Sequence, residues 1–112
     1  MFFMTLNRVY DHIIAQEGGE RLMLHVNGDA RRMIAGINQA QAKMKALGDG
    51  RTDDEYREAA LFFAGVIFGE KQAEELLKFY CGDAGCVIIF CAQYFTRRLA
   101  KKIDKAQKRT KV

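Results

Sequence analysis

The sequence predicts a mainly helical single domain of about four helices with an N-terminal β-hairpin, which is α+β by strict count. Its 112 residues are 49% apolar and include no proline, a composition typical of a folded chain with uninterrupted helices. Asp29, Thr52 and Asp83 are good helix N-caps, and each precedes apolar residues at helical spacing. Gly18-Gly19 lies between two segments that alternate in polarity, as the arms of a hairpin do.

Residues 1–27 form the hairpin region. Leu22, Leu24 and Val26 alternate with Met23 and His25, and Glu17-Gly18-Gly19-Glu20 is a tight turn. Residues 9–16 supply the other arm, with one side formed by Val9, Asp11, Ile13 and Ala15. Residues 5–16 also fit a helix that Gly18 would end, so strand and helix both stay open there. We favour the hairpin because a lone strand cannot satisfy its backbone groups.

Four helices are expected over residues 29–48, 53–68, 70–81 and 83–109. The first has apolar residues at intervals of three and four until Gly48, and the second begins with a capping box, Thr52 to Glu55. The loop between them is Gly48-Asp49-Gly50-Arg51. Gly69 and Gly82 end the second and third helices.

The last helix changes character along its length. Its first half is apolar on every face, which requires surrounding helices. Its second half keeps only a stripe, for which we expect the residues Ile88, Ala92, Phe95, Leu99, Ile103 and Ala106. The other faces form a basic arm, which we expect to project toward a partner: Arg97, Arg98, Lys101, Lys102, Lys105, Lys108 and Arg109.

Charge is distributed unevenly. Residues 97–112 hold 8 of the 18 basic and 1 of the 14 acidic side chains, so this end carries +7 and the remaining residues −3, giving +4 in total. Such an arm attracts polyanions or an acidic partner, or serves only as a solvated helix end beside the negative end of the helix dipole. Because no aromatic residue is interleaved with it after Phe95, we do not expect a sequence-selective nucleic-acid reader.

No catalytic or metal-binding pattern appears, so we expect neither an enzyme nor a cofactor. His12 and His25 lack a neighbouring ligand in sequence, and the glycine turns lack phosphate-loop spacing. The acids after Thr52 are explained by helix-start chemistry. Three cysteines spaced by five are expected to be buried, reduced and inert. No segment is long and apolar enough for a membrane span, and we expect a cytoplasmic protein.

Aromatic residues offer a binding surface. Eight of the twelve fall within residues 62–95, more than a small core is expected to hide. Most should pack inside. We expect Phe62, Phe68 and Tyr94, which lie off the cleanest core stripes, to be exposed and to contact a partner.

Part of the sequence resembles a known family. The resemblance runs from Phe63-Ala64-Gly65-Val66-Ile67-Phe68-Gly69-Glu70-Lys71-Gln72-Ala73 through Leu77, Phe79-Tyr80, Gly82-Asp83, Cys86-Val87-Ile88, Tyr94-Phe95 and Arg98-Leu99 to Lys105-Ala106-Gln107-Lys108. These residues resemble the tail assembly chaperones of Gram-positive siphophages and related prophages, over about residues 29–108. The pattern consists of apolar and small residues without a catalytic signature.

The resemblance implies a partner. A tape measure protein is a long, apolar, helical chain that aggregates unless small helical subunits coat it, each with an apolar groove, until tail tube subunits enclose it. The expected function is therefore a tail assembly chaperone for the tape measure protein, in the bacterial host cytoplasm. Self-association and contact with the tail tube protein are further expectations. Two alternatives stay open: a nucleic-acid-binding module that uses the basic helix, and a structural oligomerisation subunit.

Overall fold

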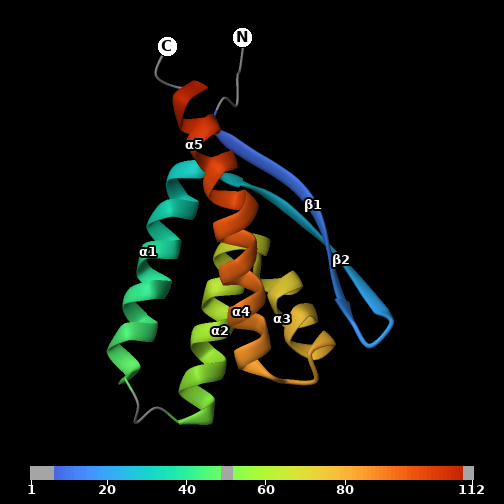
Figure 1. The fold of residues 1–112 in the computed structure, drawn as a ribbon. Coiled ribbons are helices and arrows are strands. Elements are labelled where there is room, and N and C mark those ends of the chain that lie inside the picture. Colours follow the sequence, from blue (N-terminus) through green and yellow to red (C-terminus); the bar gives the residue numbers. More distant parts are fainter. Residues whose placement is uncertain (1–6, 49–51, 110–112) are drawn as a thin grey trace.

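The computed structural model describes residues 7–48 and 52–109, with the backbone alone for Arg109. Figure 1 shows a long two-stranded ribbon lying along one side of a group of helices. The predicted fold class, a small helical domain with an N-terminal hairpin, is confirmed. Of the predicted loop after Gly48, residues 49–51 lie outside the described residues.

The hairpin consists of β1 (Arg8–Glu17) and β2 (Glu20–Asp29), paired antiparallel with Glu17 opposite Glu20. Gly18 and Gly19 have φ values of 56° and 86°, which glycine adopts without strain and which a tight two-residue hairpin turn requires. The predicted side is correct: Val9, Asp11 and Ala15 face the helices and are buried. The helical alternative for the described part of residues 5–16 is therefore wrong.

The N-caps work as the sequence indicates. The Asp29 carboxylate accepts from two backbone N–H groups at the start of α1 (Ala30–Leu47), and Asp83 accepts from the Cys86 N–H at the start of α4 (Ala84–Tyr94). Thr52 Oγ1 accepts from the Glu55 N–H, 3.2 Å away, at the start of α2 (Asp53–Phe68). These bonds satisfy N–H groups that have no partner within their helix.

A short helix, α3 (Glu70–Phe79), follows α2 after Gly69. It ends two residues earlier than predicted. Cys81 and Gly82 both have positive φ, and the Gly82 N–H donates back to the Leu77 carbonyl, 2.8 Å away, which closes the helix. α2 contacts α1, α3 and α4, so it forms the centre of the helical layer.

The last helix is one continuous rod with a π-helical segment inside it. α4 leads into η2 (Phe95–Leu99) and then α5 (Ala100–Arg109), and the Ala100 N–H donates to the Phe95 carbonyl, five residues earlier. A π turn inserts one residue into the helical surface. The buried stripe is therefore Val87, Cys91, Tyr94, Leu99, Ile103 and Ala106.

The predicted stripe is thus correct only from Leu99, the last residue of the π segment, onward. Of the predicted positions before Leu99, Ile88 and Phe95 are half-buried and Ala92 is exposed. Val87, Cys91 and Tyr94 take the core positions instead. The step of five residues from Tyr94 to Leu99 is possible because of the inserted residue, and it lets both side chains face the same core.

The exposed edge of β2 is covered by a side chain. Gln72 of α3 accepts from the His25 N–H and donates to the His25 carbonyl, both at 2.8 Å. Its amide also donates to the Phe68 carbonyl at 2.6 Å. The Gln72 amide therefore pairs with β2 as a further strand would, which blocks strand addition at this point.

Candidate functional surfaces

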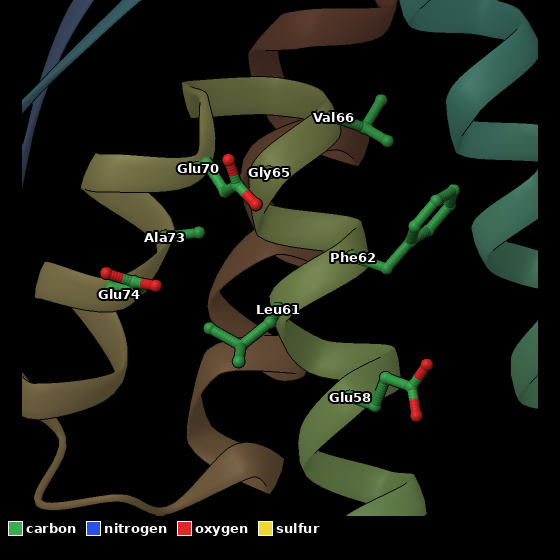
Figure 2. Close-up of a pocket in the computed structure, with 8 residues that line it drawn as sticks. All are labelled: Glu58, Leu61, Phe62, Gly65, Val66, Glu70, Ala73 and Glu74. Carbon is green, nitrogen blue, oxygen red and sulfur yellow. The ribbon is translucent and has the colours of Figure 1, made fainter.

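A groove beside α2 combines an apolar lining with three glutamates. It encloses about 480 Å³ between α2 and α3 (Figure 2). Its lining is Leu61, Phe62, Gly65, Val66, Ala73, Glu58, Glu70 and Glu74. Figure 2 shows Leu61 pointing toward α3 and Phe62 and Val66 pointing toward α1, so apolar side chains diverge on both sides of the groove.

Gly65 leaves the middle of this groove open. A Cβ added there would have no atom within 4 Å. The α2 backbone is therefore accessible between the diverging side chains, and a ligand can approach the helix closely. The three glutamates add negative charge around the apolar lining, so the groove favours ligands that combine apolar and basic groups.

The prediction that three aromatic residues are exposed is mostly wrong. Phe68 is 6% exposed and Tyr94 is 7% exposed. Their rings stack at a centroid distance of 5.8 Å, and the Tyr94 hydroxyl donates to Asp11 of β1. Phe62 is half-buried at the groove, with Lys43 Nζ 4.6 Å from its ring centroid. Only Phe62 remains a candidate contact for a partner.

A buried carboxylate joins the hairpin to the last helix. Asp11 is 8% exposed and accepts hydrogen bonds from Tyr94 Oη at 2.7 Å and from Arg98 Nη2 and Nε at 2.8 and 3.2 Å. The His12 N–H also donates to it at 2.9 Å, and Lys102 Nζ lies 4.0 Å away. Asp11 therefore has the partners that a buried charge needs.

These partners determine the ionisation of the cluster. Burial by itself would raise the pKa of Asp11, but the bonds from Tyr94 and the His12 N–H and the charges of Lys102 and Arg98 hold it below its ordinary value of 3.8. The pKa of Tyr94 is raised, first by burial and then by its bond to Asp11. The pair therefore consists of a carboxylate and a neutral phenol, a structural connection and not an acid–base pair poised near neutral pH.

The basic arm does not project freely, contrary to the prediction. Leu99, Ile103 and Ala106 are buried, and α5 packs against α1 and β1 of its own domain. Arg98 binds Asp11, and Lys108 Nζ lies 3.0 Å from Asp104 Oδ2. Arg97, Lys101 and Lys105 are exposed and Lys102 is half-buried. The Arg109 side chain lies outside the described part of the arm.

The histidines, which are distant in sequence, lie next to each other. His12 is opposite His25 in the hairpin, and their Nδ1 atoms are 2.6 Å apart. Over the described ranges, no group of three or more metal-ligating side chains forms. The acids at the start of α2 remain exposed, as helix-start residues are.

The cysteines follow their environments. Burial raises the pKa of Cys91 to about 12. The pKa of Cys86 is also raised, first by the hydrogen bond between the Cys86 thiol and Asp83. Neither thiol is activated as a nucleophile. Cys81 is exposed, so the prediction of buried cysteines is wrong there. Its position in the positive-φ turn after α3 explains the exposure.

Sequence reasoning missed several surface features. Tyr10, Ile14 and Met23 are 58%, 50% and 62% exposed on the outer face of the hairpin. Their positions follow from the same alternation that places Val9 and Asp11 inside, so the pattern contained this signal. The groove glutamates gave no such signal, because solvent-facing acids are ordinary on helices.

Comparison of the chain with protein-family models, with curated proteins and with solved structures found no match. Among the described helices, none has the length and apolar character that crossing a membrane requires.

Proposed function

We propose that this chain is a tail assembly chaperone whose α2–α3 groove binds an apolar helical segment of the tape measure protein. The open groove at Gly65 is the observation that carries the proposal. It is lined by apolar side chains and is about 480 Å³ in volume, large enough for a few side chains of a helix laid across it.

The resemblance supports the same location. Gly65, Val66, Glu70 and Ala73 all line the groove and all belong to the continuous stretch, residues 63–73, that resembles the chaperones. The glutamates suggest the chemistry of the client segment, an apolar stripe flanked by lysine or arginine. Many weak contacts of this kind along one client chain give strong overall binding.

A leucine at position 65 tests the groove. Because a Cβ at Gly65 meets no atom within 4 Å, Gly65→Leu should fill the groove without disturbing the core. Ala92→Leu is the matched control, since Ala92 is an exposed helical position on α4 outside the groove. Each variant is co-expressed with a tape measure protein from a siphophage tail module, and the soluble fraction of that protein is measured.

We expect wild type and Ala92→Leu to keep the tape measure protein soluble and Gly65→Leu to fail, with all three melting normally. If a folded Gly65→Leu protein solubilises the client as well as wild type, the groove is not the binding site. If wild type itself never solubilises the client, the chaperone function is wrong.

A further inference from the structure

A second hollow, formed by different elements, lies between β1 and α5. It encloses about 450 Å³ and is lined by Arg8, Val9, Tyr10, Lys102, Lys105 and Lys108. We call it the β1–α5 cleft. Every charged residue in this lining is basic, and none of its residues belongs to the α2–α3 groove. The cleft therefore attracts anions, whereas the groove repels them.

Contacts within the fold position Arg8 and Lys102, and Lys108 Nζ lies 3.0 Å from Asp104 Oδ2. Arg8 donates from Nε and Nη2 to Asn27 Oδ1 at 3.2 and 2.6 Å. Lys102 lies 4.0 Å from Asp11, a carboxylate already bound by Arg98 at 2.8 Å. Arg8, Lys102, Lys105 and Lys108 thus line one cleft. The Asp11 carboxylate near Lys102 is shared with a fifth cation, Arg98.

The spacing of the lysines suits a linear polyanion. Lys102, Lys105 and Lys108 follow one another at intervals of three residues on α5. At a rise of about 1.5 Å per residue they span about 9 Å along the helix axis. In B-form geometry the stacked nucleotides of one strand rise about 3.4 Å each, so two or three of them match this length. The three amines can therefore contact successive phosphates of a single strand.

The basic arm has no aromatic residue after Phe95 in sequence, but the fold places one from β1 at the same cleft. Tyr10, whose side chain lies on the outer face of the hairpin, also lines the cleft from β1 and is 58% exposed. Proteins hold single-stranded nucleic acid by stacking bases on exposed aromatic rings while phosphates contact basic side chains, and Tyr10 and the three lysines line the same cleft. An acidic peptide would use the amines and leave the ring without a role.

From this arrangement we infer that the β1–α5 cleft binds single-stranded nucleic acid without sequence selectivity. A base stacks on Tyr10, and adjacent phosphates contact Lys102, Lys105 and Lys108. The surface is separate from the client groove, so this activity does not depend on the proposed chaperone function.

Fluorescence anisotropy with a labelled twelve-nucleotide oligothymidylate tests the inference. Lys105→Gln/Lys108→Gln removes two cleft amines, and Lys71→Gln/Lys78→Gln on α3 makes the same change in net charge elsewhere. We expect the cleft variant to bind at least tenfold more weakly at low salt. The slope of log affinity against log salt should fall by about 1.4, or about 0.7 per lost phosphate contact. The α3 variant should stay within twofold of wild type.

Tyr10→Thr tests the stacking, since threonine also favours strands and Tyr10 is exposed. We expect at least fivefold weaker binding, with an unchanged melting transition and unchanged solubilisation of the tape measure protein. Tyr10→Phe should bind as wild type does.

Three results would overturn the inference: equal weakening by the α3 variant, undiminished binding by Tyr10→Thr, or equally tight binding of a duplex or a polyglutamate peptide. Each would reduce the cleft to general attraction of polyanions.

Discussion

Two glycines inside helices should respond oppositely to the same substitution. Gly36 lies in α1 and Gly65 in α2, and neither has the positive φ that would itself oppose a side chain. Alanine removes the backbone freedom of glycine in the unfolded chain, which stabilises a helix interior by about 0.5–1 kcal/mol. This gain should be similar at both positions, so their surroundings decide the outcome.

The surroundings differ sharply. A Cβ at Gly65 meets nothing within 4 Å, whereas a Cβ at Gly36 would lie 2.6 and 2.8 Å from the two γ-methyl carbons of Val66. Ordinary carbon–carbon contacts are about 3.5–4.0 Å, and Val66 cannot rotate away cheaply because valine is restricted to few rotamers in a helix. Overpacking of this kind costs about 1–3 kcal/mol.

Gly65→Ala should therefore raise the melting temperature by about 2–4 °C, at about 4 °C per kcal/mol for a domain of this size. Gly36→Ala should lower it by up to about 10 °C, since a cost of about 1–3 kcal/mol less a gain of about 0.5–1 kcal/mol leaves a net loss of about 0–2.5 kcal/mol. Thermal unfolding followed by far-ultraviolet circular dichroism measures both, and urea unfolding gives the free energies.

Val66→Ala provides the internal control. Because it removes the two methyl groups that crowd position 36, the double variant Gly36→Ala/Val66→Ala should be more stable than the sum of the single changes predicts, by about 1–3 kcal/mol. The reasoning is refuted if Gly36→Ala stabilises the protein as much as Gly65→Ala does, or if the two substitutions in the double variant are additive.

Three further predictions concern hydrogen bonds and thiols. Asp11→Asn should destabilise the fold by about 1–3 kcal/mol, as loss of a buried charged acceptor does, and Arg98→Gln by less because Arg98 is half exposed. Since folding lowers the pKa of Asp11, the carboxylate contributes its full stabilisation of the folded state above its ordinary pKa of 3.8, and this stabilisation is lost as pH falls through the lower pKa of the folded state. Urea unfolding below pH 4 should show this loss of stability in wild type and not in Asp11→Asn. Gln72→Ala should speed hydrogen exchange at the His25 backbone N–H, which donates to the Gln72 side chain. An unchanged exchange rate would mean that the Gln72 side chain does not protect this edge of β2. A thiol reagent should label Cys81 in the folded protein and reach Cys91 only after unfolding, and mass spectrometry of labelled peptides would detect the reverse order.

The local features of the fold were predictable because local chemistry determines them. Asp29, Thr52 and Asp83 each accept an N–H at a helix start, and Gly18-Gly19 forms the turn that joins the strands. These assignments need only a residue and its neighbours along the chain. The helix boundaries consequently agree with the predicted ones within two residues among the described helices.

The π segment could not be predicted, because the sequence also contains an uninterrupted α-helical stripe. Ala92 and Phe95 fit regular spacing up to Leu99, whereas the folded protein buries Cys91 and Tyr94 and inserts one residue. Tyr94 takes its place because its hydroxyl meets Asp11, 83 positions away in the sequence. A contact between residues so far apart in sequence cannot be predicted from the spacing of apolar residues along one helix.

The candidate site was only partly predictable for the same reason. Phe62 is at the groove, but Phe68 and Tyr94 are buried, and their burial depends on how the helices and the hairpin pack together. The cleft aromatic was also missed, since Tyr10 is far from the lysines in sequence and meets them only in the folded chain.

Because Asp11 contacts the last helix, an element near the start of the chain is buried by residues near its end. Within the described range, β1 is the first element that a ribosome would release, yet the side chains that cover its carboxylate, Tyr94 and Arg98, follow 83 and 87 positions later. A two-stranded hairpin is at best marginally stable alone, and contacts over such separations form slowly. β1 therefore cannot be fully buried until Tyr94 and Arg98 have been synthesised, and it is among the last parts of the chain to be buried.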